Sequence, residues 1–208
     1  MAFGFSVCLY FYAVILLLTK TQNIEDKTES WHWMGIAISL SQTVGLHHDP
    51  DRWGYNQRLT DHQRRLWRRI WWSCFFRDRW LSFGMGRPPR ISMKVCDVPM
   101  TSAEDVVSTQ AALDYSVKAK YLPPDLLQLA QRWIILLRLS KILGVILSKN
   151  YRPSGLMPTS AWVKATEKEA SDCITDFPDL RMDYSKLTTF YTHHLRLHYE
   201  YTSQMQIA

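Results

Sequence analysis

The chain has 208 residues, of which 47% are hydrophobic and 21% charged, with nine tryptophans and sparse, clustered Gly and Pro. This composition excludes a disordered segment, suits the core of one domain, and favours long helices over a β-sandwich or barrel. The net charge of +6 is concentrated between Arg52 and Arg90, where ten arginines and two aspartates give a local charge of +8. Such a block is typical of a solvated helix face, which we favour, or of a surface for nucleic acid or an acidic partner.

The four cysteines are isolated from one another at positions 8, 74, 96 and 173. Without a CxxC pair, the sequence encodes neither a zinc cluster nor a redox motif, and no cofactor is expected in this chain. Single cysteines in apolar surroundings are typical of small core residues in a reducing compartment.

Residues 2–18 are nearly all apolar. A membrane span needs ~20 such residues, so we interpret the stretch as a buried helix centred on Tyr10 to Leu18. A signal or membrane anchor, and a wrongly assigned start at Met1, remain alternatives.

The next predicted helix begins near Asp26 or Thr28 and ends at Gly45. Its core face repeats every three or four residues at Trp31, Met34, Ile38 and Ser41. The segment His47-His48-Asp49-Pro50 follows, and glycine followed by proline is a usual helix terminator.

A long central helix is predicted from a cap at Thr60-Asp61 to about Phe83. Its first half is amphipathic and its second half is apolar nearly all round, which predicts burial. The core stripe consists of Leu66, Trp67, Ile70, Trp71, Cys74 and Phe75. Asp78 lies on this stripe and therefore requires a cationic or hydrogen-bonding partner.

Gly84 and Gly86 end this helix, Pro88-Pro89 force an extended turn, and residues 91–100 are predicted to form an irregular strap on the bundle. Residues 101–110 are predicted to be a loop or short turn. Four further helices are expected at Ala111–Ala119, Leu126–Ser148, Ser160–Ile174 and Tyr184–Ile207. The predicted fold is all-α: an irregular bundle of six or seven helices with a proline-rich strap after the central helix.

No catalytic or metal site is predicted. His194 and His198 have the i, i+4 spacing of metal ligands, but the glutamate of a zinc hydrolase is absent, and packing among tyrosines is the preferred interpretation. His47-His48-Asp49 has no GxSxG nucleophile motif to accompany it, and neither GxGxxG nor GxxxxGK[ST] occurs. The central tryptophans are interpreted as core rather than as a ligand-stacking set.

Four ordered motifs within residues 31–100 resemble the fungal-specific transcription factor domain, the middle homology region of zinc binuclear-cluster activators. The first is the run around Gly45, His47, Asp49 and Pro50. The others are an arginine–tryptophan helix, a Gly-Arg-Pro turn and an Asp-Val-Pro segment. Their residues are Arg68, Trp71, Trp72, Asp78, Arg79, Gly86, Arg87, Pro88, Asp97 and Pro99. The cutinase and fatty-acid-utilisation activators look like the nearest subgroup.

The resemblance implies a non-catalytic regulatory domain, residues 1–208, controlling RNA polymerase II transcription in the nucleus. In such proteins DNA is bound by an N-terminal zinc cluster, which is absent here, so zinc and DNA are expected only through that missing domain. Intramolecular or protein partners and a small-molecule effector are compatible with it, and a membrane is not expected.

The alternatives are a helical domain that itself senses a small molecule and a helical protein anchored in a membrane by residues 2–18. Within the fold, we hypothesise that Asp78 pairs with an arginine, for which Arg87 is the candidate, and so fixes the strap to the central helix.

Overall fold

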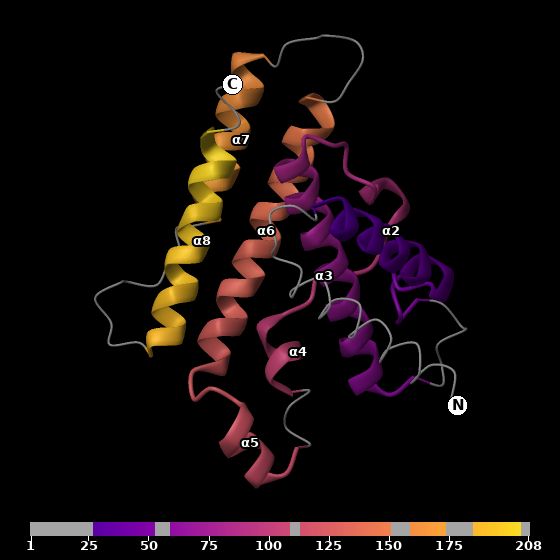
Figure 1. Cartoon of the computed structure of the whole chain (residues 1–208), viewed down its shortest axis with the longest axis vertical. Coiled ribbons are helices and arrows are strands. Elements are labelled where there is room, and N and C mark those ends of the chain that lie inside the picture. The colour runs from indigo at the N-terminus through magenta and orange to yellow at the C-terminus, as the bar shows by residue number, and fades with distance from the viewer. Residues whose placement is uncertain (1–26, 53–58, 109–112, 151–158, 174–184, 205–208) are drawn as a thin grey trace. The chain divides into compact units, whose positions relative to one another are not determined.

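A computed structural model describes residues 27–52, 59–108, 113–150, 159–173 and 185–204. In this part of the chain the secondary structure consists of seven α-helices and one 3₁₀ turn, with no strand, which confirms the all-α prediction (Figure 1). The elements are α2 (Lys27–Val44), α3 (Asp61–Met85), η3 (Met93–Val95), α4 (Ala103–Ser108), α5 (Tyr115–Tyr121), α6 (Leu126–Asn150), α7 (Ser160–Asp172) and α8 (Lys186–Gln204).

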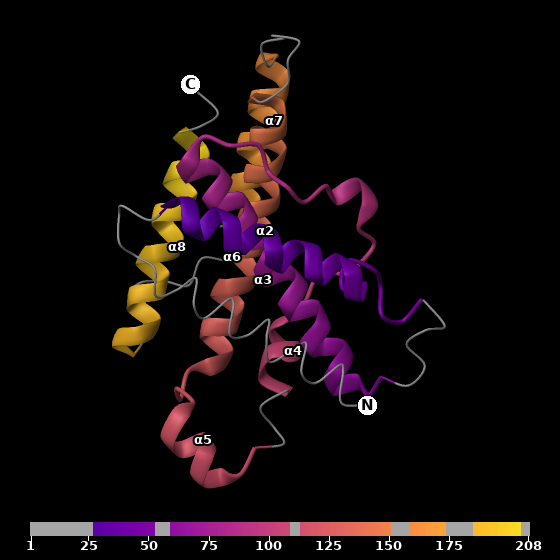
Figure 2. The same cartoon turned by 45° about the vertical axis from the view of Figure 1, so that its right-hand side comes forward.

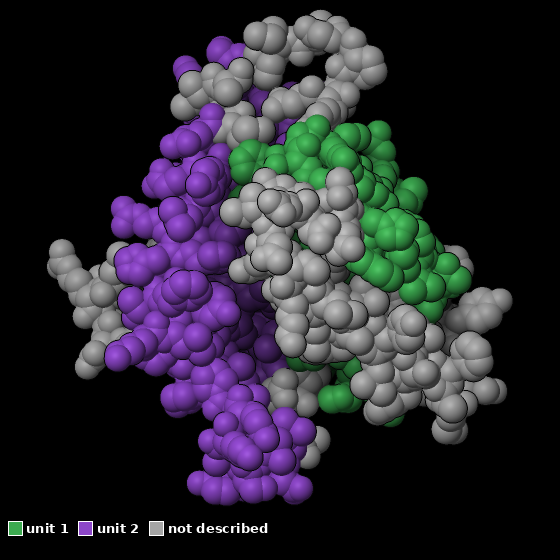
Figure 3. Space-filling model, viewed as in Figure 1, with its two compact units in different colours: residues 1–101 green, residues 102–208 purple. Residues whose placement is uncertain are grey.

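The chain divides into two compact units, residues 1–101 and residues 102–208 (Figure 3). The first contains α2, α3 and the strap, and the second contains α4 to α8.

In the first unit, α2 packs against α3. Its buried face includes Met34, Ala37, Ile38 and Ser41, as the three-to-four spacing predicts. Gly45 ends the helix with φ of 86°, in the left-handed region that glycine adopts without a Cβ penalty.

Helix α3 begins with a capping box, in which Thr60 accepts from the backbone N–H of Gln63 while the Gln63 side chain accepts from that of Thr60. The C-terminal half is buried on several faces, at Ile70, Trp71, Trp72, Cys74, Phe75, Asp78, Arg79 and Ser82. Leu66 and Trp67, which precede this half, are half-buried. The helix therefore has the predicted amphipathic start and buried end. Gly86 follows it with φ of 61°.

In the second unit, α6 is the central helix and contacts α4, α7 and α8. Figure 1 and Figure 2 both show α6 and α8 side by side. Ile142 and Ile146 of α6 and Ala170 of α7 form one core cluster, against which Trp162 and Tyr199 pack. These contacts place α4, α7 and α8 around α6.

Two short helices differ from the prediction. The loop expected at residues 101–110 contains α4, because Ser102 and Asp105 exchange hydrogen bonds between side chain and backbone in a capping box that uses aspartate. The helix expected at Ala111–Ala119 starts later, as α5, since the carbonyl of Asp114 accepts from the N–H of Lys118.

The helix predicted at Tyr10–Leu18 lies outside the described residues. Among the helices that are described, none is long and apolar enough to cross a membrane.

Candidate functional site

The candidate site is the set of contacts that fastens the strap, residues 91–100, to α3 and to the turn after α2. We use the name latch for its centre: the side chains of Asp78 and Arg79 and the backbone of Arg90 and Ile91. All four lie in the first unit. Asp78 is 0% exposed and Arg79 3% exposed, so the two side chains of the latch are almost entirely removed from solvent.

Each oxygen of the Asp78 carboxylate accepts hydrogen bonds. One oxygen accepts from the Arg90 backbone N–H at 3.0 Å, and the other from the Ile91 N–H at 3.0 Å and from an Arg79 guanidinium N–H at 2.5 Å. Arg79 also donates to the Ile91 carbonyl at 2.7 Å. The two side chains thus bind the beginning of the strap through both its N–H and its C=O groups.

Burial raises the pKa of the Asp78 carboxyl, and the Ile91 N–H and the Arg79 guanidinium oppose that shift. Burial likewise lowers the pKa of Arg79, opposed by Asp78. Burial penalises the charged form of each residue, and the opposite charge of the partner offsets part of that penalty.

The expectation that an arginine pairs with Asp78 is confirmed, but the choice of Arg87 is wrong. Arg79 is the partner because both side chains converge on the same strap peptide. The guanidinium of Arg87 instead lies 5.3 Å from the ring centre of Trp31 on α2, and that of Arg90 lies 4.2 Å from it. These cation–π contacts connect α2 to the turn at Pro88-Pro89.

A second fastening joins the strap to the turn after α2. The carbonyl of His47 accepts from the N–H groups of Asp97 and Val98 at 3.2 and 3.3 Å. The carboxylate of Asp97 accepts from the Asp49 N–H and contacts the His48 ring nitrogen, both at 3.1 Å. The hydrogen bond from His48, together with that from the Asp49 N–H, lowers the pKa of Asp97 against a raising contribution from burial.

A third fastening holds the end of the strap to α3. The indole N–H of Trp72 donates to the Pro99 carbonyl at 2.8 Å. Trp72 is 2% exposed, so the bond is shielded from water. The motif residues on α3, at the first turn and on the strap are therefore brought together.

The remaining motif residues have local structural positions. The Asp49 side chain accepts a hydrogen bond from the Asp51 N–H, and Pro50 is buried. Trp71 is fully buried beside the His47 ring, and the two ring centres are 5.7 Å apart. Gly86 is the left-handed cap of α3 described above. Arg68 binds Asp51 at 3.3 Å.

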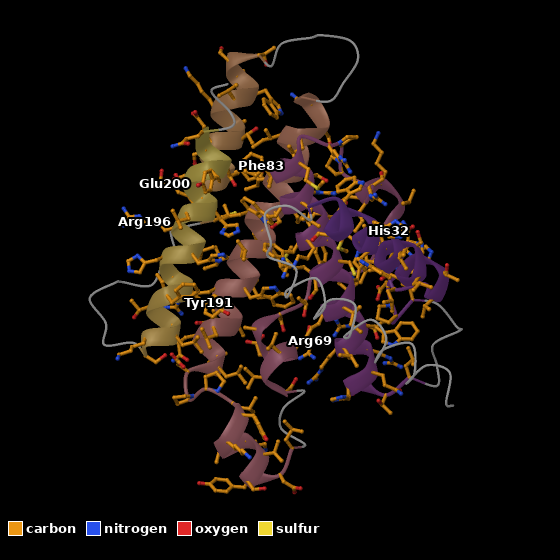
Figure 4. The ribbon with its side chains drawn as sticks, viewed as in Figure 1. His32, Arg69, Phe83, Tyr191, Arg196 and Glu200 are labelled. Atoms are coloured by element: carbon orange, nitrogen blue, oxygen red, sulfur yellow. The ribbon has the colours of Figure 1, made fainter. Side chains whose placement is uncertain are left out.

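Two arginines of the basic first half of α3 form ion pairs with one aspartate. Asp51, which precedes the helix in sequence, contacts Arg64 and Arg68, each at 3.3 Å. Figure 4 shows Arg69, from the same half, among the labelled side chains. Sequence reasoning missed Asp51 and, although it placed Trp31 on a core face, missed the contacts of Trp31 with Arg87 and Arg90. Only their positions just before an arginine-rich helix and on a core face could have indicated them.

The thiols near the latch are not activated nucleophiles. Burial raises the pKa of Cys74 to about 11 and that of Cys96 to about 11, so both are protonated at neutral pH. On α8 the His198 ring nitrogen bonds to the His194 carbonyl at 2.8 Å, so that nitrogen is engaged by backbone. Among the described residues, no three His, Cys, Asp or Glu side chains gather into a group that could hold a metal ion. The chemistry of the site is that of holding segments together.

Comparison with known proteins shows the family of the chain. The sequence profile described as the fungal specific transcription factor domain matches residues 8–197. The chain is 43% identical over 93 residues to cutinase transcription factor 1 beta of Fusarium vanettenii, covering 45% of this chain and 10% of that protein. It is 30% identical over 140 residues to cutinase transcription factor 1 alpha of the same fungus, covering 67% and 14%.

A third relative, transcription factor cpaR of Aspergillus oryzae, is 29% identical over 163 residues, covering 76% of this chain and 27% of that protein. The chain thus spans about a tenth to a quarter of the length of these relatives. No solved structure matches it. The relatives are regulators of transcription rather than enzymes, and the chain belongs to the fungal-specific transcription factor domain family.

Proposed function

We propose that this domain restrains a nuclear transcription activator, and that the latched strap is the part of the domain that maintains the restraint. The activator binds DNA through a zinc cluster that lies outside these 208 residues. We expect zinc only in that other domain, as the family resemblance implies.

One observation carries the proposal. The motifs that characterise the resemblance converge on the strap, which is held at three points by Asp78, His47 and Trp72. A buried ion pair is a costly way to stabilise a fold, and a registry or switching role is its best-attested use. A strap fixed in this way has a defined attached state that a partner or effector can compete with.

The test is a reporter assay in yeast. The chain is inserted between a heterologous DNA-binding domain and a strong activation domain, and reporter output is compared with that of the same fusion without the insert. If the domain restrains activation, reporter output is lower with the insert than without it at equal protein abundance. Asp78→Asn is expected to restore much of the lost output. Asp61→Asn, an exposed site on the same helix, is the matched control and is expected to leave the restraint unchanged.

Equal output with and without the insert would refute the restraining function. Restraint that persists in Asp78→Asn at wild-type abundance would refute the role of the latch while leaving the restraining function standing. A fluorescent fusion of the full-length protein tests the nuclear location separately.

A further inference from the structure

Helix α8 has two separate faces, one buried and one exposed. One face is buried within the second unit and includes Thr188, Thr192, Leu195 and Thr202. It is fixed to α6 by a hydrogen bond of 2.5 Å from Arg132 to the Thr192 hydroxyl. A helix already held by this face requires no exposed apolar face for the fold of its own unit.

The second face is exposed. Leu187, Phe190, Leu197 and Tyr201 are 43%, 61%, 56% and 52% exposed, and the half-buried His194 lies between them, its ring stacked on that of Phe190. We name these five residues the α8 seam. Successive members are three, four, three and four residues apart. This is the spacing of the a and d positions of a coiled coil.

We propose that the α8 seam binds the seam of a second copy of this chain, with the two α8 helices antiparallel. The argument for this occupant is charge complementarity. Lys186, His193 and Glu200 follow one edge of the seam at intervals of seven residues, and both Lys186 and Glu200 are exposed. Figure 4 shows Glu200 projecting from α8 together with Arg196.

In an antiparallel pair, residues of this edge face the same edge of the other helix. Lys186 of each copy then meets Glu200 of the other, which forms two ion pairs, one at either end of the seam. A parallel pair would place Lys186 opposite Tyr191, and no opposite charges would meet. The edge therefore favours the antiparallel arrangement.

In this register, side chains of the two seams pack against each other in opposing pairs. Leu187 packs on Leu197 of the second copy, and Phe190 packs on His194, while Tyr201 lies beyond these paired layers. Tyr191 flanks the seam on the edge opposite Lys186, and the two Tyr191 side chains meet near the twofold axis. The exposed parts of these side chains amount to roughly 500 Å² per copy, or about 1,000 Å² in total, which is the lower limit of specific interfaces. The expected dimer is therefore weak and concentration-dependent.

The test is sedimentation velocity of the 208-residue chain from about 1 µM upward. Wild type is expected to shift from monomer to dimer with rising concentration. Lys186→Glu and Glu200→Lys each create two like-charge contacts and are expected to weaken the dimer about tenfold. The double variant is expected to recover wild-type affinity.

This recovery separates an intermolecular pair from an intramolecular one. The two residues are fourteen positions apart on one straight helix, or about 21 Å, so they do not meet within a single α8. Both sites are exposed, so the variants are expected to fold. A wild-type chain that stays monomeric, a dimer indifferent to both reversals, or a double variant that stays weak would each overturn the proposal.

A cross-link checks the register. Tyr191→Cys is expected to form a disulfide-linked dimer under mild oxidation, because the two side chains meet at the twofold axis. Thr189→Cys, on the polar side of α8, is the matched control and is expected to remain monomeric. Equal cross-linking of the two variants would overturn the antiparallel register.

Discussion

Replacing Asp78 by asparagine removes the charge at the centre of the latch while preserving the size of the side chain. The carboxylate accepts hydrogen bonds from three donors, the guanidinium of Arg79 and the backbone N–H groups of Arg90 and Ile91. An asparagine side chain has one oxygen that accepts hydrogen bonds. Its NH₂ group takes the place of the second carboxylate oxygen and faces groups that are themselves donors. At least one donor loses its acceptor, and Arg79 becomes a buried charge without a counter-charge.

The expected loss is ~3–5 kcal/mol in the free energy of unfolding, the usual effect of removing one partner of a buried ion pair. Because a domain has a total stability of ~5–15 kcal/mol, the variant should unfold at much lower denaturant concentration. Asp61→Asn is the matched control: this exposed carboxylate contacts Arg64 at 3.5 Å, and its loss should cost less than ~1 kcal/mol.

Urea unfolding followed by tryptophan fluorescence measures this loss. Seven of the nine tryptophans lie in residues 1–101, so their emission reports mainly on the first unit. Circular dichroism at 222 nm reports on the helices of both units. The two signals together identify which unit is destabilised.

A loss no larger than that of the control would refute the reasoning. The double variant Asp78→Asn/Arg79→Met provides a second check, because it removes the buried positive charge as well. It should be more stable than Asp78→Asn alone. A double variant as unstable as the sum of the two single variants would show that the two residues do not act as a pair.

Three further predictions follow from local geometry. Trp72→Phe removes the donor to the Pro99 carbonyl and should cost about 2 kcal/mol in urea melts, with faster proteolysis of the strap; unchanged proteolysis would contradict the third fastening. Gly86→Ala places a Cβ at φ of 61° and should lower stability by ~1–2 kcal/mol, whereas Gly84→Ala, where a Cβ meets open space, should not. Burial lowers the pKa of His198 to about 4, below its unfolded value of 6.5, so the unfolded chain binds the proton more readily. The contribution of His198 to the free energy of unfolding therefore has its full value above pH 6.5. It falls by roughly 1–2 kcal/mol toward pH 4, a figure that already allows for solvent screening. His198→Gln should reduce this pH dependence in circular dichroism melts, and an unchanged slope would show that other groups are responsible.

The long helices could be predicted from the sequence because their apolar spacing and their caps agree. Thr60 and Gln63 form the cap of α3, and Gly45 and Gly86 end α2 and α3 where the sequence places them. The short helix α4 was missed because its six residues have too little periodicity, and its cap uses Asp105 in place of the commoner glutamate or glutamine.

The need of Asp78 for a partner was also predictable, since a carboxylate on a core stripe cannot remain alone. Its partner was not. Neighbouring residues on a helix point about 100° apart, which argues against Arg79, and Arg87 lay nearer the strap in sequence. The strap peptide at Ile91 decides the outcome, because it draws both side chains to one place. Such a tertiary requirement has no signature in local spacing.

The hydrogen bonds that fasten the strap differ in the number of residues that separate the two bonded groups along the chain. The bonds from Arg90 and Ile91 to Asp78 join residues 12 and 13 apart, whereas those of Asp97 with His48 and Asp49 join residues 49 and 48 apart. By loop-closure entropy, the longer connection costs about 1.2 kcal/mol more to form from an unfolded chain. Folding is therefore expected to attach the beginning of the strap to α3 first, so that Asp97 is already positioned when the turn after α2 arrives.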